Sequence, residues 1–271
     1  GQFGPKLKAL VLEWHHVHKA TESAIHGFLT NHAIMISEAT LSRMVTDNHE
    51  AFHQEKDDIV REGLASTDYQ QMDDTGARVK GKNHYSHILC NPFFTAFFTR
   101  RNKDRLTIID ILTQGEMRFV LDERAYRLME RMNLSPKQID RVKALKEEES
   151  NSRDEMDTIL TRLFPGPKKH ASARRVILEA AAIAAYRQLP HAISILLSDD
   201  APQYKNISEC LALCWVHDGR HYKKLLPVVP QHATYLKRFL THYWDYYHRL
   251  LEYKKQPTSS LAQLLRNEFD T

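Results

Sequence analysis

The sequence predicts an α/β fold in which two short strands, far apart in the chain, each end in a pair of aspartates. The first pair closes the run Tyr-Gln-Gln-Met-Asp73-Asp74-Thr-Gly, and the second closes Ile-Ser-Ile-Leu-Leu-Ser-Asp199-Asp200-Ala-Pro. Helical periodicity fills most of the remaining chain. Two carboxylates at neighbouring strand ends can hold divalent cations, although Asp-Asp before Gly or Pro is also ordinary turn chemistry. The order of the elements therefore has to decide between these readings.

Composition limits the class of protein. With 271 residues and 42% hydrophobic side chains, the chain can bury a full core and has room for about two domains. No apolar run approaches the ~18–20 residues of a membrane span, and the first residues lack a signal-peptide layout, so no membrane partner is expected. Cys90, Cys210 and Cys214 are too few and odd in number for a disulfide framework, which fits a reducing cytoplasm.

Charge is spread unevenly along the chain. Residues 1–68 carry 6 basic and 10 acidic side chains, a net charge of −4, whereas residues 69–271 carry 32 basic and 24 acidic ones, a net charge of +8. A positive second part is compatible with a polyanionic partner. The 16 histidines are scattered and do not define a site.

Residues 1–66 are expected to form an N-terminal helical unit. Apolar residues at spacings of three, four and seven predict a helix over residues 6–32, and Ser37 is a good N-cap for a short helix over residues 38–45. This layout is that of a helix-turn-helix, in which Arg43 can touch DNA, but any helical hairpin looks similar. A third, highly charged helix is expected over residues 48–64.

The period then changes from helical to extended. Short strands are predicted at residues 69–74, 77–79, 84–90 and 95–99, separated by turn residues such as Gly76, Lys80-Gly81 and Asn91-Pro92. They form an antiparallel meander with Asp73 on its first strand. A helix over residues 103–114 follows.

The second half is mainly helical and is interrupted by one buried strand. Residues 116–188 are helical and rich in charge, and the apolar run 192–198 has no alternation, which is typical of a strand buried on both faces. Helices are expected over residues 207–226, 232–255 and 259–269.

This order matches the ribonuclease H-like fold by analogy. In that fold the first strand is central and the fourth lies parallel beside it, which would bring Asp73 and Asp199 together. The core would then consist of residues 67–115 and 191–271, with residues 116–190 as a large helical insertion.

Three motifs in the same order resemble the transposases of insertion-sequence family 66. They are Met72-Asp73-Asp74-Thr75-Gly76-Ala77-Arg78-Val79, Leu197-Ser198-Asp199-Asp200, and Cys214-Trp215-Val216-His217 followed by Arg220. The resemblance covers roughly residues 35–270. It implies a DDE-type enzyme of the bacterial cytoplasm and nucleoid, with Asp73 and Asp199 as catalytic metal ligands for Mg²⁺, or alternatively Mn²⁺. It also implies transposon-end and target DNA as partners and a homo-oligomer on DNA.

The sequence departs from that family at two places. The segment 116–190 is an unusually long insertion, and no Asn-Asn of the family's third-acid motif occurs in the chain. Glu268 is the last glutamate, but its surroundings are those of an ordinary amphipathic helix. The third acid is therefore expected beyond Thr271, and this chain alone is expected to bind metal weakly and neither to cleave nor to join DNA.

Further residues are candidates for accessory roles. Asp74 and Asp200 are expected to point away from their neighbours' metal, because side chains alternate along a strand. His217 and Arg220 can lie near the metals, which the resemblance suggests. DNA phosphates can be met by hairpin and helix-start residues, which are Arg78, Lys80, Lys82, Lys168, Lys169, Arg174 and Arg175, although charged tips and runs are often merely solvated. No zinc is expected, because one straight helix carrying Cys210, Cys214, His217 and His221 rarely supplies four ligands.

Two other functions stay open. The chain can be a non-catalytic DNA-binding or assembly module derived from a transposase, or a related nuclease of the ribonuclease H-like fold that cuts without joining. Metal titration separates the first of these from the enzymes, and a strand-transfer assay separates the second from a transposase.

Overall fold

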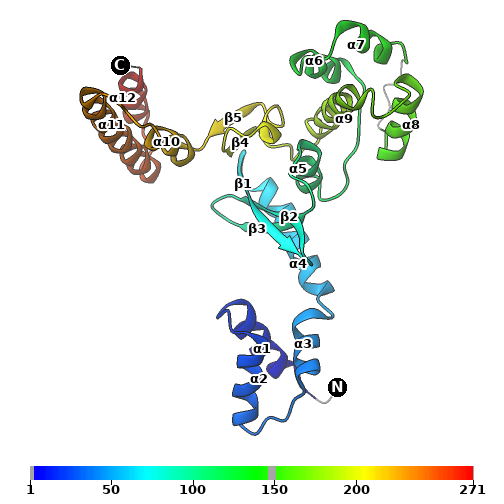
Figure 1. Ribbon diagram of the computed structural model, residues 1–271, viewed down its shortest axis with the longest axis vertical. Coiled ribbons are helices and arrows are strands. Elements are labelled where there is room, and N and C mark those ends of the chain that lie inside the picture. The colour runs from blue at the N-terminus through cyan, green and yellow to red at the C-terminus, as the bar shows by residue number, and fades with distance from the viewer. Residues whose placement is uncertain (1–2, 146–150, 271) are drawn as a thin grey trace. The chain divides into compact units, whose positions relative to one another are not determined.

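The computed structural model describes residues 3–145 and 151–270, and it divides into two compact units, Gly1–Arg61 and Glu62–Thr271 (Figure 1). Each unit has its own packed core. Helix α4 (Glu50–Ala65) contains the boundary between them and corresponds to the helix predicted at residues 48–64.

The core of the first unit is formed by α1 (Pro5–His16), α2 (Glu22–Asn31) and α3 (Glu38–Thr46), and this unit also includes α4 as far as Arg61. The prediction of one continuous helix over residues 6–32 was wrong. The chain breaks where Lys19 takes a left-handed φ of 58°, and Thr21 then caps α2 by accepting the N–H of Ala24 at 3.2 Å. Because the break is made by a lysine and not by glycine or proline, composition did not signal it.

The core of this unit joins all three helices and the connection before α3. It contains Val11, Ile25, Leu29, Ile36 and Leu41, each at most 7% exposed. The predicted cap of α3 is confirmed, because Ser37 Oγ accepts the N–H of Thr40 at 3.2 Å.

A mixed five-stranded sheet is the centre of the second unit, which confirms the α/β class. Its strands are β1 (Tyr69–Val79), β2 (Lys82–Cys90), β3 (Thr95–Arg100), β4 (Ile195–Ser198) and β5 (Cys210–Leu213), in the order β3-β2-β1-β4-β5. Strands β1, β2 and β3 form an antiparallel meander, and β4 and β5 run parallel to β1. The two short predicted strands before Lys80 are one continuous strand.

A two-residue turn fixes the register of the β1–β2 hairpin. Val79 pairs with Lys82, and the intervening Lys80 and Gly81 have φ values of 48° and 75°. Positive φ at both positions defines a type I′ turn, whose twist suits two antiparallel strands.

The two faces of the sheet differ in burial. On one face Met72, Leu89, Ala96 and Leu196 are at most 4% exposed. The end of α4 packs on this face, where the buried Gln70 donates to the carbonyls of Gly63 and Leu64 at 3.3 and 3.4 Å. Because side chains alternate along a strand, the other face carries the residues between these, and it is more open. There Phe97 is 63% exposed and Ile195 is 37% exposed.

Helices fill the connection between β3 and β4. They are α5 (Arg105–Leu112), α6 (Glu123–Arg131), α7 (Pro136–Lys143), α8 (Arg153–Leu163) and α9 (Ala171–Tyr186). Local sequence explains their starts, because Asp104, Asp122 and Ser152 each accept backbone N–H groups of the following turn. Helix α9 is buried along most of its length and packs against α5 and α6.

The chain ends in three helices, α10 (Trp215–Lys223), α11 (Pro230–Lys255) and α12 (Ser259–Phe269). The last two agree with the predicted helices, whereas the helix predicted over residues 207–226 is confirmed only in its second part, as α10, and was wrong in its first part. Cys210–Leu213 instead forms β5, because its backbone completes the sheet beside β4. Among the described residues, no helix combines the length and apolar character that crossing a membrane requires.

Candidate active site

The strand register places Asp73 and Asp199 on adjacent strands. Strands β1 and β4 run parallel, and their last paired residues are Gln71 and Leu197. Asp73 follows two residues later within β1, on its more open face, and Asp199 follows two residues later, directly after the end of β4, so both lie at the same end of the two strands. Asp73 and Asp199 are far apart in the chain, but the sheet brings them to neighbouring strand ends.

Each of these carboxylates is half-buried and fixed by one local backbone donor. Asp73 Oδ1 accepts the N–H of Asp74 at 2.8 Å, and Asp199 Oδ1 accepts the N–H of Ala201 at 3.1 Å. No side-chain cation forms an ion pair with either carboxylate within residues 3–145 and 151–270. Both groups therefore keep lone pairs for another ligand.

Three aspartate carboxylates affect the pKa of one buried tyrosine, Tyr204. Burial raises the pKa of Tyr204 well above its usual range, and the Asp74, Asp199 and Asp73 carboxylates add to the increase. Likewise, burial raises the pKa of the Cys90 thiol, and the Asp73 carboxylate adds to it. The carboxylates of Asp74, Asp199 and Asp73 thus all lie close enough to Tyr204 for their charges to act on its hydroxyl.

Asp74 faces the opposite side of the sheet and is already occupied. Its side chain is only 7% exposed. It accepts Gln203 Nε2 at 2.9 Å, the Tyr204 hydroxyl at 3.2 Å and Lys103 Nζ at 3.3 Å. Asp74 therefore joins β1 to the segment that directly follows Asp199, and it is poorly placed to share a ligand with Asp73.

Arg105 also contacts the segment that directly follows Asp199. Its guanidinium donates to the carbonyls of Pro202 and Lys205 at 2.7 and 2.9 Å, and it forms an ion pair with the buried Glu179 of α9. Asp200 points outward, is 66% exposed and pairs with Lys205 Nζ at 3.0 Å. The turn after β4 is thus anchored to β1, α5 and α9, and this fixes the position of Asp199.

Two carboxylates suit a hard cation such as Mg²⁺, which prefers oxygen ligands. Among residues 3–145 and 151–270, no group of three or more His, Cys, Asp or Glu side chains gathers in a metal-binding arrangement. Glu268, on α12, forms an ion pair with Arg249. Within the described residues, Asp73 and Asp199 are thus two carboxylates with the right chemistry for such an ion, and no third metal-binding side chain gathers with them.

The motif around Cys214 lies in a different setting from the one predicted. Cys210 belongs to β5 and Cys214 is the N-cap of α10, so the prediction of one helical face with His217 and His221 was wrong. The N–H of Cys214 donates to the carbonyl of Ser198 at 2.7 Å, which brings the start of α10 next to the end of β4. Among the described residues His217 Nδ1 has no hydrogen-bond partner, although it is buried, and Arg220 is exposed.

The hairpin cations extend away from the aspartates. Arg78 and Lys82 are exposed near the tip, with Lys80 in the turn itself. With a rise of about 3.3 Å per residue, Arg78 lies about 17 Å along β1 from Asp73. In the first unit, Arg43 folds back onto its own helix, donating to the Ala39 carbonyl and to Thr40 Oγ1, both at 3.3 Å.

The basic run before and within α9 is divided between solvent and internal contacts. Lys168 and Lys169 are exposed in the turn before α9. Arg174 donates to the Phe164 carbonyl at 3.4 Å and to Thr161 Oγ1 at 3.3 Å, and Arg175 lies 4.0 Å from Glu179. The two lysines therefore remain the more accessible pair.

Sequence reasoning missed Tyr204, Arg105 and Glu179. Only the folded chain brings them to the site, since Arg105 and Glu179 are 74 residues apart. The signal for Tyr204 was its position just after Asp199, in a turn that also contains Pro202.

Comparison with known proteins supports the resemblance of the sequence. The model described as "Transposase IS66 family" matches residues 1–134, a range that contains Asp73 but not Asp199. The expected range of 35–270 therefore began too late, and its second half lies outside this match.

A curated relative covers more of the chain. "Uncharacterized protein y4jO" of Sinorhizobium fredii is 26% identical over 215 residues, which are 78% of this chain and 65% of that protein. The chain thus spans about two thirds of the relative's length. No solved structure matches the chain.

Proposed function

We propose, from the premise that this chain resembles the Transposase IS66 family over residues 1–134, that it supplies part of the catalytic centre of a DNA transposase. The observation that supports the proposal is the parallel register of β1 and β4, in which Gln71 pairs with Leu197 and Asp73 and Asp199 each follow two residues later. In this proposal the sheet is ribonuclease H-like. The strand order β3-β2-β1-β4-β5, with β2 antiparallel to its neighbours, supports that assignment.

Asp73 and Asp199 would hold Mg²⁺, or Mn²⁺ in its place. When bound, such ions activate the attacking oxygen and stabilise the leaving oxygen of a phosphodiester. The two aspartates supply anionic oxygen ligands from a partly buried position, where charge is less screened than at the surface. Each accepts a single backbone N–H and retains further lone pairs, which would be available to the ion.

The surrounding residues would keep Asp199 in place. Asp74, through Tyr204 and Gln203, fixes the segment after Asp199, and Arg105 holds the same segment by two carbonyls. A site tolerates only small displacements of its ligands, so these contacts make Asp74 and Arg105 positioning residues. His217 and Arg220, near the end of β4 through the start of α10, would be accessory residues.

The proposed partner is DNA. In a DDE transposase the freed 3′-hydroxyl of the transposon end attacks target DNA, and the protein acts as a homo-oligomer on DNA. We expect two protein ligands to bind the ions weakly and the reaction to need a further acid, since two-metal chemistry requires enough anionic ligands for both ions.

The test is a cleavage and strand-transfer assay of the full gene product with its own transposon-end DNA and Mg²⁺. We expect cleavage followed by joining, and loss of both on Asp73→Asn or Asp199→Asn, whereas Asp200→Asn should remain active. Cleavage without joining would identify a nuclease. DNA binding without cleavage, unaffected by Asp73→Asn, would identify a non-catalytic assembly module.

A further inference from the structure

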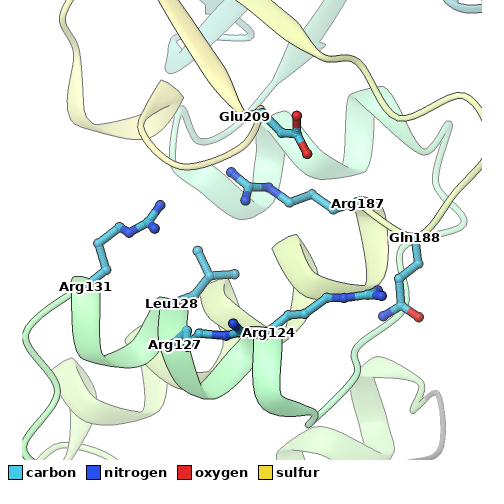
Figure 2. A pocket seen from close by; sticks show the side chains of 7 residues that line it. All are labelled: Arg124, Arg127, Leu128, Arg131, Arg187, Gln188 and Glu209. Atoms are coloured by element: carbon cyan, nitrogen blue, oxygen red, sulfur yellow. The ribbon is translucent and has the colours of Figure 1, made fainter.

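A cavity of about 670 Å³ lies outside the aspartate site, in the helical region between β3 and β4. Four arginines line it: Arg124, Arg127 and Arg131 from α6, and Arg187 from the end of α9. Figure 2 shows the α6 residues on one side and Arg187 with Glu209 on the other. With four guanidinium groups against one carboxylate, the lining is strongly positive.

The α6 arginines are largely uncommitted. Arg124 and Arg131 are exposed, and within the part of the chain that the structure describes neither guanidinium group forms a hydrogen bond or an ion pair; Arg124 donates only its backbone N–H, to Asp122 Oδ1 at 3.0 Å. Arg127 donates only to the Glu123 carbonyl of its own helix, at 3.2 Å. Their packing role is small, so their convergence on one cavity calls for another explanation.

Arg187 has a different role in the cavity wall. Its guanidinium donates to the carbonyls of Asn206, Ile207 and Ser208 at 2.9, 3.1 and 2.5 Å. Burial and the nearby positive charge of Arg131 lower its pKa. The positive charges of Arg187 and Arg131 thus repel each other, and a bound anion would offset this repulsion.

The spacing of the α6 arginines indicates the shape of that anion. Positions 124, 127 and 131 follow one face of the helix, and a rise of 1.5 Å per residue spreads them over about 10 Å. A single phosphate cannot meet all three. A DNA strand carries one phosphate per about 3.4 Å of helix axis, so successive phosphates of one strand can contact all three arginines. Arginine also suits phosphate because its fork donates two parallel hydrogen bonds.

We propose that this arginine pocket binds the phosphate backbone of DNA, with Arg124, Arg127 and Arg131 as the contacting residues and Arg187 as a fixed positive wall. The inference rests on the proposed function in that it takes DNA as the partner. It gives the helical region between β3 and β4 a role in holding DNA, separate from the aspartates.

The test is fluorescence anisotropy of labelled double-stranded DNA across a salt series, using the whole chain. We compare the wild type with Arg124→Gln/Arg131→Gln and with a control that also removes two charges, Lys137→Ala/Lys254→Ala. Both altered arginines are exposed, so folding should be retained, and circular dichroism checks this.

We expect the arginine variant to bind DNA at least tenfold more weakly. The slope of log affinity against log salt should fall by about 2, since each neutralised phosphate contributes about 0.9. The control should keep the wild-type slope. Unchanged affinity and slope in the arginine variant overturn the pocket assignment alone and leave the proposed function standing.

Two other arms separate the remaining outcomes. A wild-type chain that binds no DNA at any salt overturns the inference together with its premise. Inorganic phosphate is titrated by calorimetry as the small-ion probe. Phosphate binding that the arginine variant loses while DNA affinity stays unchanged overturns the assignment in favour of a free-phosphate site.

Discussion

Asp73 and Asp74 are neighbours with opposite surroundings. Asp73 lies on the open face with its charge available, and Asp74 lies on the buried face with three side-chain donors. Because side chains alternate between the two faces along a strand, Asp73 is a candidate ligand and its neighbour Asp74 is a positioning residue. Sequence could predict this division, because it follows from the period of two, but not the partners of Asp74.

Replacing Asp74 by alanine should destabilise the second unit. The Tyr204 hydroxyl is fully buried and would lose its acceptor, which costs about 1–3 kcal/mol. Urea unfolding measures the change. The control Asp200→Ala removes an exposed carboxylate paired with Lys205 and should change stability by less than about 1 kcal/mol. Equal stability of both variants would contradict the role of Asp74.

Tyr186 should make the protein sensitive to alkali. Burial raises its pKa to about 12, above the ordinary value of 10. The neutral form is therefore favoured in the folded state, and this stabilisation is complete below pH 10 and is lost as pH rises toward 12. We expect the stability difference between wild type and Tyr186→Phe to shrink over that window in urea unfolding. A difference that stays constant from pH 9 to pH 12 would show that Tyr186 does not titrate there.

Among the elements, α10 and α11 pack unusually closely at one glycine. A Cβ atom at Gly219 would come within 2.6 Å of the Trp244 ring. Around this contact, Trp215 stacks on Tyr243 with ring centroids 4.7 Å apart, and the Tyr243 hydroxyl donates to Asp218 at 3.0 Å. Aromatic side chains of α11 thus pack against α10.

Gly219→Ala should loosen this helix pair. Overpacking of this kind costs about 1–3 kcal/mol, and amide hydrogen exchange should become faster in α10 and α11. Gly27 is the matched control, because it lies within α2 and a Cβ there meets nothing within 4 Å. Gly27→Ala should slow exchange in α2, since alanine favours a helix by up to about 1 kcal/mol. Slower exchange around Gly219→Ala would disprove the close contact.

Element boundaries show what local sequence can and cannot predict. Capped helices such as α3 were predictable because the Ser37 side chain acts on its own turn. Strand β5 was not, because Cys210–Leu213 is short and exists through pairing with β4, a partner outside its own sequence window. The break at Lys19 likewise depends on a backbone conformation that lysine rarely takes.

At the scale of the whole molecule, the sheet topology brings the two aspartates together. Sequence order and an analogy of fold predicted that β1 and β4 are neighbours, and the parallel register agrees. The contacts that hold the turn after Asp199 could not be predicted, since Arg105, Glu179 and Asp74 come from three separate elements.

The charge distribution predicts where DNA affinity resides. Because residues 69–271 carry a net charge of +8, reversing charge at the exposed Lys168 and Lys169 should weaken binding to all DNA sequences alike and reduce its salt dependence. Anisotropy with two unrelated duplexes measures this. If these reversals have no effect while Arg43→Ala abolishes binding, the first unit is the DNA reader instead.

In the proposed function, Asp73 and Asp199 hold a divalent cation together. Electron paramagnetic resonance of Mn²⁺ titrated into the chain measures bound metal directly, even where affinity is weak. We predict measurable binding to the wild type and to Asp200→Asn, whose carboxylate is exposed and paired with Lys205, and loss of binding in both Asp73→Asn and Asp199→Asn. Wild-type binding that persists in either of these two variants would show that Asp73 and Asp199 do not hold the cation together.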